Sequence, residues 1–177
     1  PRPAEGGGEP DVTVVVMAYN EAATLSPVVD ELAGALGALG RPWELVIVDD
    51  GSTDGTGELA DRLAATRSGV HVIHHSVNLG LGGVYRTGFG VARGRHVTFF
   101  PADGQFPATI LPAFRGAIES ADLVLGTLPG RRGTPLSTLL SFVERGLYRA
   151  LLGPMPRFQG ILMFRRTLVA GMDLRSE

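Results

Sequence analysis

The sequence predicts an α/β protein whose sheet is mostly parallel and carries helices on both faces, as in a Rossmann-like fold. Two observations support this prediction. Short apolar runs rich in β-branched residues recur along the 177-residue chain, and such runs suit strands that are buried on both faces. The longer stretches between them begin with residues that favour helix starts, which indicates that strands and helices alternate.

The first half of the chain predicts three strands and two connecting helices. We expect strands over Val12–Ala18, Glu44–Asp49 and Val70–His74, and helices over residues 24–39 and 54–67. Thr24 and Asp54 are suitable N-cap residues, because their side-chain oxygens can accept a hydrogen bond from a free backbone NH. Gly40 is suited to end the first helix.

The second half continues the alternation as far as residue 125. We expect a helix of small residues over Leu81–Arg93, a strand over His96–Phe100, a helix over Pro107–Ser120 and a short strand over Leu123–Leu125. Proline is tolerated in the first turn of a helix, so Pro107 marks a helix start.

Composition excludes several classes of protein. Apolar residues make up 44% of the chain, charged residues 19%, and the net charge is -2, which argues against a disordered or nucleic-acid-binding polypeptide. There is no cysteine, so disulfides and thiolate metal sites are excluded.

Pro1–Pro10 resembles neither a signal peptide nor a transit peptide. We expect a flexible lead-in over 1–10, one domain over 11–177 and a cytoplasmic location.

Four polar or glycine-rich loops follow predicted strands. Ligands bind at the carboxyl ends of the strands in parallel sheets, so these loops should converge on one site. In the first loop, Tyr19 could stack on a base while Asn20 and Glu21 accept hydrogen bonds from it or from a ribose. The alternative is that Asn20 and Glu21 only turn the chain.

The second loop is acidic and lies in Asp49–Thr56. Asp50 could bind ribose hydroxyls or a base NH at the end of its strand. The same residues partly match a calcium-binding loop, but a strand rather than a helix enters this loop, and Asp61 stands where that loop has glutamate. We therefore reject calcium binding.

The third loop begins at Asn78 and is rich in glycine. Free NH groups at the start of the following helix could bind phosphate. Tyr85 stands where a dinucleotide-binding fingerprint would need its last glycine, which weakens an oxidoreductase interpretation. The alternative is close packing of the helix on the sheet through its glycines, namely Gly82, Gly83, Gly88 and Gly90.

The fourth loop could bind a divalent cation. Asp103 and Gln105 place a carboxylate and an amide oxygen two residues apart after a buried strand, and oxygen ligands suit Mg²⁺ or Mn²⁺ beside a diphosphate. The alternative is that Asp103 only shapes the turn before the next helix.

Taken together, the four motifs resemble glycosyltransferase family 2, which has the GT-A nucleotide-sugar fold. The family's P-x-Y-N-E, V-D-D-x-S-x-D-G-T, N-x-G and D-A-D-x-Q motifs correspond to residues 17–21, 48–56, 78–80 and 101–105. The branch most similar in pattern contains the dolichyl- and polyprenyl-phosphate sugar synthases. The resemblance implies an inverting transfer of a sugar from a UDP or GDP donor to a lipid phosphate at the inner face of the membrane.

The resemblance also implies roles for particular residues. The nucleotide-sugar site would consist of Tyr19, Glu21, Val48, Asp50, Arg86, Ala102 and Asp103. Asp103 would be the catalytic residue and would hold Mg²⁺ or Mn²⁺ together with Gln105. Arg131 and Arg132 would bind the acceptor phosphate, because a guanidinium pairs bidentately with phosphate oxygens. The alternative is ordinary solvated charge on a loop. The stretch Leu139–Leu152 would then be an amphipathic helix near the acceptor that packs on the core, with a position at a membrane surface as the alternative.

The sequence departs from the family pattern at several positions. Pro101 replaces the first acidic residue of D-A-D, so metal binding is in doubt. The later family motif is only partly matched over Arg157–Arg166, and the chain stops before the family's closing elements. Both a truncated chain and a divergent short member fit the sequence. The alternatives to the transferase are a degenerate module that binds a nucleotide sugar with little turnover and, ranked lower, a sugar-phosphate nucleotidyltransferase.

Overall fold

The computed structural model describes residues 8–126 and 160–169. The chain divides into two units, residues 1–124 with 161–177 and residues 125–160, and the site considered below lies within the first. Arg131, Arg132, the predicted helix over Leu139–Leu152 and the start of the later family motif all lie outside the described residues.

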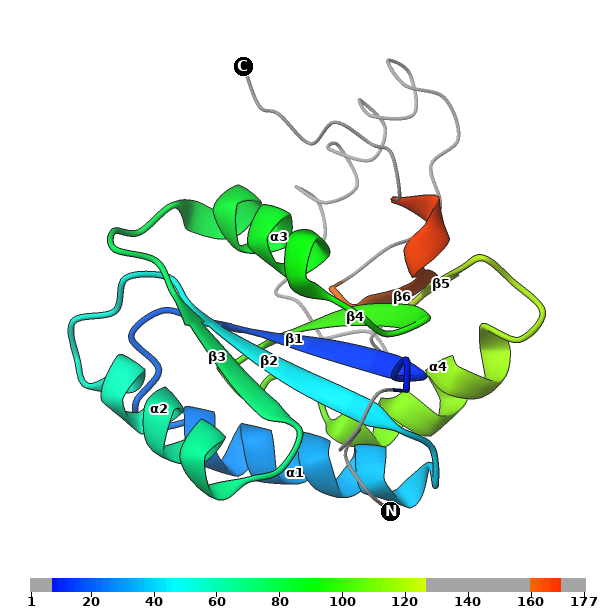
Figure 1. Ribbon diagram of the computed structural model, residues 1–177, viewed down its shortest axis with the longest axis horizontal. Coiled ribbons are helices and arrows are strands. Elements are labelled where there is room, and N and C mark those ends of the chain that lie inside the picture. Colours follow the sequence, from blue (N-terminus) through cyan, green and yellow to red (C-terminus); the bar gives the residue numbers. More distant parts are fainter. Residues whose placement is uncertain (1–7, 127–159, 170–177) are drawn as a thin grey trace, which may run out of the picture. The chain divides into compact units, whose positions relative to one another are not determined.

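A six-stranded, mostly parallel sheet forms the centre of the fold, as predicted (Figure 1). The strands are β1 (Val12–Ala18), β2 (Trp43–Asp49), β3 (Val70–His74), β4 (His96–Pro101), β5 (Leu123–Leu125) and β6 (Leu162–Arg165). They lie in the order β3-β2-β1-β4-β6-β5. β1 pairs in parallel with β2 and β4, β2 pairs in parallel with β3, and β6 runs antiparallel to β4.

Helices cover both faces of this sheet. They are α1 (Leu25–Ala38), α2 (Thr56–Thr66), α3 (Gly80–Val91) and α4 (Leu111–Ala117), with short 3-10 turns at Ala108–Ile110 and Arg166–Leu168. α1, α2 and α4 lie on one face and α3 on the other (Figure 1). Two separate groups of buried apolar residues, one on each side of the sheet, form the core. Within residues 8–126 and 160–169, no helix is both long enough and apolar enough to cross a membrane.

The structure corrects several local predictions. Thr24 precedes α1, but its side chain makes no capping hydrogen bond, and α2 begins after Gly55 instead of at Asp54. The predicted helix over Pro107–Ser120 is a 3-10 turn followed by a short α-helix that ends at Ala117. Gly40 has φ +66° just after α1 and so ends it as expected.

The glycines of α3 divide into two kinds. A Cβ on Gly88 would lie 2.5 Å from the Phe99 ring, and one on Gly83 would collide with Leu79, so both positions require close packing. The prediction of close packing is wrong for Gly82 and Gly90, because a Cβ on either would meet nothing within 4 Å. Of these four glycines, only Gly88 lies directly against side chains of the sheet.

Buried charges are paired at the amino-terminal edge of the strands. The Arg115 guanidinium donates to Asp11 at 2.6 Å, and both side chains are almost fully buried. The Glu44 carboxylate accepts hydrogen bonds from the Thr13 hydroxyl at 2.6 Å and the Arg93 guanidinium at 2.7 Å. Because unpaired charges are costly to bury, these contacts hold the ends of four elements in place.

Candidate nucleotide-sugar site

The strand register brings the four predicted loops to one edge of the sheet. Ala18 at the end of β1 is paired with Asp49 at the end of β2, which is paired with His74 at the end of β3. Met17 is paired with Pro101, the last residue of β4. The loops after these strands therefore start from one row of residues, and the predicted convergence is correct.

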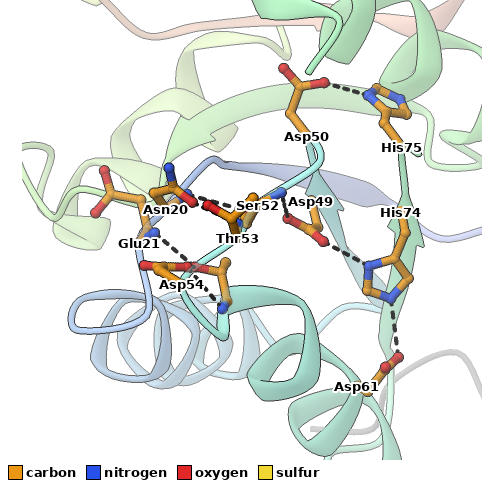
Figure 2. A network of polar contacts seen from close by, with 11 residues as sticks. Asn20, Glu21, Asp49, Asp50, Ser52, Thr53, Asp54, Asp61, His74 and His75 are labelled. Carbon is orange, nitrogen blue, oxygen red and sulfur yellow. Dashed lines mark hydrogen bonds and ion pairs between the residues drawn. The ribbon is translucent and has the colours of Figure 1, made fainter. Parts of the chain in front are cut away.

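The first two loops are joined by hydrogen bonds around Asn20 (Figure 2). The backbone NH of Asn20 donates to the Ser52 hydroxyl at 2.9 Å, and its side-chain oxygen accepts from the Thr53 NH at 2.8 Å. Asn20 has φ +56°, a left-handed conformation that non-glycine residues rarely adopt. The two hydrogen bonds hold this conformation, so Asn20 shapes the loop beside the exposed Tyr19.

Asp54 and Thr56 join the same two loops closer to α1 and α2. One Asp54 oxygen accepts from both the Thr56 NH at 3.0 Å and the Thr56 hydroxyl, and the other accepts from the Ala22 NH at 3.2 Å. The hydrogen bond from Thr56 is the main cause of the lowered pKa of Asp54. The Glu21 NH donates to Thr56, while the Glu21 carboxylate accepts from Thr24 at 2.6 Å. The interpretation of Glu21 as a turn residue is therefore supported by its contacts.

Asp50 anchors the third loop. Its oxygens accept hydrogen bonds from the Leu79 NH and the Gly80 NH, both at 2.9 Å. One oxygen also lies 2.6 Å from Nδ1 of His75, whose Nε2 lies 2.7 Å from the Thr87 hydroxyl. The carboxylate is almost fully buried. Asp50 thus places the start of α3 beside the other loops.

Asp49, which precedes Asp50, binds a second histidine on the opposite side of the sheet. One Asp49 oxygen accepts from the Ser52 NH at 3.1 Å, and the other lies 2.8 Å from Nδ1 of His74. Burial of Asp49 opposes its ionisation, but the hydrogen bonds from Ser52 and His74 outweigh that effect and lower the pKa of Asp49. The paired aspartates therefore anchor different loops, as Figure 2 shows.

The fourth loop places Asp103 and Gln105 as predicted at the end of β4. The Ala102 NH donates to the Met17 carbonyl, which fixes the loop to β1. One Asp103 oxygen accepts from the Gln105 NH at 2.9 Å, so Asp103 does shape the turn. Within the described part of the chain, the other Asp103 oxygen has no hydrogen bond, and it remains available to a ligand.

The remaining predicted residues differ in exposure. Tyr19 is 48% exposed, so its ring is accessible to a base. The side chains of Val48 and Ala102 are buried, and these two residues could contact a nucleotide only through their backbone. Arg86 is exposed on α3, in the helix that Asp50 anchors.

Sequence reasoning missed the histidines and the role of Asp49. His74 and His75 end the third predicted strand, and each pairs with one of the two aspartates that end the second. The sequence did contain a signal for these pairs, because both histidines and both aspartates stand at strand ends, and the ends of neighbouring parallel strands lie side by side. Asn20 was recognised as a turn residue, but its bridging contacts depend on a loop 32 residues away.

Comparison with known proteins points to one family. The model of "Glycosyl transferase family 2" matches residues 13–166. An undecaprenyl-phosphate mannosyltransferase of Micrococcus luteus is 38% identical over 67% of this chain and 49% of its own length. A polyprenol monophosphomannose synthase of Mycolicibacterium smegmatis is 36% identical over 96% of this chain and 70% of its own length. The chain thus spans about half of the first relative and under three quarters of the second.

Solved structures give the same answer for the fold. Glucosyl-3-phosphoglycerate synthase from Mycobacterium tuberculosis, in complex with Mn²⁺, UDP-glucose and phosphoglyceric acid, has a TM-score of 0.69 and 26% identity. The match covers 92% of this chain and 59% of that one. A mannosyltransferase from Pyrobaculum calidifontis, solved with GDP-mannose and Mn²⁺, has a TM-score of 0.65 and 24% identity, which supports the GT-A fold alone. With its four motif loops at one sheet edge, the chain belongs to glycosyltransferase family 2.

Proposed function

We propose that this chain binds a nucleoside-diphosphate sugar at the carboxyl edge of the sheet and transfers the sugar, with inversion, to a polyprenyl phosphate. The observation that carries the proposal is the convergence of all four motif loops at the ends of β1, β2, β3 and β4. The names of the relatives support the acceptor, because both are polyprenyl-phosphate mannosyltransferases by description.

The donor nucleoside would lie against the first two loops. The exposed ring of Tyr19 offers a stacking surface, and Asp50 and the backbone of Val48 lie at the end of the adjacent strand. Glu21 would contribute at the same edge, although its carboxylate already accepts from Thr24. UDP and GDP are both compatible with these residues.

The diphosphate would lie between the third and fourth loops. Arg86 is a cation on the helix that starts from the third loop, and Ala102 and Asp103 follow β4 on the other side of β1. Positive charge near the leaving diphosphate favours the reaction, because the sugar–oxygen bond breaks with build-up of negative charge. Arg131 and Arg132 would bind the acceptor phosphate.

A divalent metal is compatible with the fourth loop. Within the described residues there is no group of three or more His, Asp or Glu side chains that could hold a metal. Mg²⁺ and Mn²⁺ sites, however, often use one or two carboxylates together with substrate phosphates, and one Asp103 oxygen is available. Asp103 and Gln105 would hold the metal, which would supply charge stabilisation to the diphosphate when bound.

The acceptor determines whether a general base is needed. A lipid phosphate is already ionised at neutral pH, so its oxygen can attack the sugar carbon from the face opposite the diphosphate without losing a proton first. An alcohol acceptor would need a carboxylate base. A phosphate acceptor also implies that the protein works at a membrane surface, where polyprenyl chains reside.

Calorimetry with UDP and with GDP, with and without Mn²⁺, tests the donor site. We expect one of the two diphosphates to bind, with affinity that rises when Mn²⁺ is added and does so far less in Asp103→Asn. Asp30→Asn, in α1, is the matched control: it weakens an ion pair with Arg67 outside the four motif loops and should match wild type in nucleotide binding. Transfer of labelled sugar to polyprenyl phosphate then tests the reaction. If the chain binds neither UDP nor GDP, the proposal is contradicted.

Pro101 favours a second candidate, a module that binds a nucleotide sugar with little turnover. The family's motif has an acidic residue where this chain has Pro101 at the end of β4. If Pro101→Asp raises both Mn²⁺ affinity and turnover, the wild-type chain is an impaired enzyme. If the substitution changes neither, the chain functions without that ligand and the transferase proposal stands.

A further inference from the structure

His74 lies between two carboxylates at the edge of the proposed nucleotide site. Its Nδ1 is 2.8 Å from an oxygen of Asp49 on β2, and its Nε2 is 3.2 Å from an oxygen of Asp61 on α2. Figure 2 shows the imidazole ring between the two acids. A neutral imidazole can donate from only one nitrogen, and an ionised carboxylate can only accept. The geometry therefore fits an imidazolium that donates to both acids.

The electrostatic surroundings of His74 favour the same protonation state. The hydrogen bond to Asp49 is the main cause of the raised pKa of His74, with Asp61 acting in the same direction. Asp49 on β2 and Asp61 on α2 are the titratable groups that face the ring among the described residues. His74 therefore loses its proton at a higher pH than an ordinary histidine.

Gly57 makes the close approach of these groups possible. A Cβ at this position would lie 2.9 Å from the Asp49 oxygen that binds His74 and 3.5 Å from the His74 ring. Any larger side chain would push the carboxylate away from the imidazole. The pair is thus built into the first turn of α2 and does not depend on a chance contact between surface side chains.

A chain of hydrogen bonds connects His74 to the nucleotide-facing loops. The second oxygen of Asp49 accepts from the Ser52 NH, and the Ser52 hydroxyl accepts from the NH of Asn20. Asn20 holds the left-handed turn directly after Tyr19, whose ring is the proposed stacking surface. The orientation of Asp49 therefore affects two loops that would contact the donor.

We propose that His74 is a positioning residue for the nucleotide: its protonated ring fixes Asp49, and through Ser52 and Asn20 it holds the first two loops in their binding geometry. This inference rests on the proposed function, because it requires a nucleotide at this edge. His74 does not contact the donor itself in this scheme. Loss of its proton removes one of the two hydrogen bonds and the positive charge that attracts both carboxylates, which weakens the hold on Asp49 and with it nucleotide binding.

The test is the pH dependence of UDP and GDP binding in three variants of the full chain. His74→Gln removes the charge, His74→Arg keeps a permanent cation, and His71→Gln alters an exposed histidine of the same strand as the matched control. Affinities are measured by calorimetry from pH 6 to 9 and expressed as ratios to His71→Gln. The ratios cancel the titration of the nucleotide phosphates, which is the same for every variant.

We expect the affinity of His74→Gln to be about fivefold below the control at pH 6.5, with the ratio approaching one by pH 9 as the control loses the proton. His74→Arg should instead match the control at low pH and exceed it at high pH. A role in stability alone would lower the melting temperature without producing either pH trend. Gly57→Ala, which displaces Asp49 without removing a charge, should weaken binding at every pH.

The outcomes separate the two proposals. If wild type binds neither diphosphate at any pH, the proposed function fails, and the role of His74 fails with it. If wild type binds one of them and the ratio for His74→Gln is one throughout, only the role of His74 is overturned. An NMR titration without nucleotide adds an independent readout: the Ser52 amide signal should move with the same midpoint as the His74 ring, and an unmoved signal would contradict the relay.

Discussion

The two edges of the sheet use polar side chains in different ways. At the amino edge, buried acids pair with arginines: Asp11 with Arg115 and Glu44 with Arg93. At the carboxyl edge, acids mostly accept hydrogen bonds from backbone NH groups of neighbouring loops, as Asp50 does from the third loop. The first arrangement neutralises charge inside the fold. The second orders loops and leaves polar groups exposed to a ligand.

This difference separates a stabilising edge from a binding edge. An ion pair between buried groups contributes mainly through the penalty that follows when one partner is removed. A carboxylate that orders a loop contributes less to folding, because the loop is largely exposed, but it determines where ligand-contacting groups lie. Changes at the amino edge should therefore reduce stability, and changes at the carboxyl edge should reduce nucleotide binding.

The largest expected effect is at the amino edge. Asp11→Ala removes the buried acidic partner of the Arg115 guanidinium, which keeps the exposed Glu119 at 3.1 Å, and we expect a loss of about 3–5 kcal/mol in the free energy of unfolding. Chemical denaturation measures it. Nucleotide affinity of the folded fraction should be unchanged. The double change Asp11→Ala with Arg115→Met should recover part of the loss, and no recovery would contradict the ion-pair explanation.

A matched pair of glycines in α3 tests how closely this helix packs on the middle of the sheet. Gly88→Ala would place a methyl group 2.5 Å from Phe99, and we expect a loss of about 1–3 kcal/mol in stability. Gly90→Ala meets nothing within 4 Å and should be neutral or stabilising by about 0.5 kcal/mol. Thermal denaturation of the two variants measures the difference. Equal effects would contradict the assignment of Gly88 as the packing position.

Much of the fold could be predicted from local sequence. β1, β3 and β5 have the predicted bounds. Runs rich in β-branched residues mark β1 and β3, whereas polar and turn residues on either side mark the short β5. β6 was missed: Leu162–Arg165 is short, contains no β-branched residue and is a strand because it pairs with β4. The predicted helix from Pro107 failed in its first turn, which is a 3-10 turn, since local pattern does not distinguish the two forms.

Less of the site could be predicted. The convergence of the loops follows from the topology, and the motif residues of each loop were identified correctly as lying at one edge. The partners were not predictable, because Asn20 with Thr53 and Asp49 with His74 join residues 33 and 25 positions apart. Such pairs depend on strand order and register, which no single segment encodes. The sequence of the fourth loop fitted Asp103 both as a turn residue and as a ligand. The structure shows that it does form the turn.

A change at the carboxyl edge should have a smaller effect on stability and a larger one on binding. Asn20→Ala removes the acceptor for the Thr53 NH and places alanine at φ +56°, so we expect a loss of about 1–2 kcal/mol in stability. Nucleotide affinity should fall about tenfold, because the turn beside Tyr19 is released. Asn20→Gly, which tolerates the backbone conformation but also lacks the acceptor, should recover only the part of the stability that is due to backbone strain, and it should not recover affinity. Recovery of both would show that only the backbone conformation matters.

The smallest effect, and the sharpest contrast between the edges, is the pH dependence contributed by two histidines. Burial lowers the pKa of His96 at the amino edge, where Nδ1 donates to the Asp11 carbonyl. The hydrogen bond to Asp49 raises the pKa of His74 at the carboxyl edge. Below about pH 6.5 the unfolded chain binds a proton at His96 that the folded chain excludes, so stability falls as the pH falls. Above that pH the folded chain keeps a proton on His74 that the unfolded chain has lost, so stability falls as the pH rises.

The two contributions therefore have opposite signs on either side of an ordinary histidine pKa. Denaturation from pH 5 to 9 should show that His96→Gln removes stability loss on the acid side, while His74→Gln removes it on the alkaline side. Only the alkaline limb should be accompanied by weaker nucleotide binding, because His74, unlike His96, is connected to the loops of the site through Asp49. If both substitutions changed stability on the same side of the pH range, the two edges would not differ in their response to pH. The distinction between a stabilising edge and a binding edge would then fail for these two histidines.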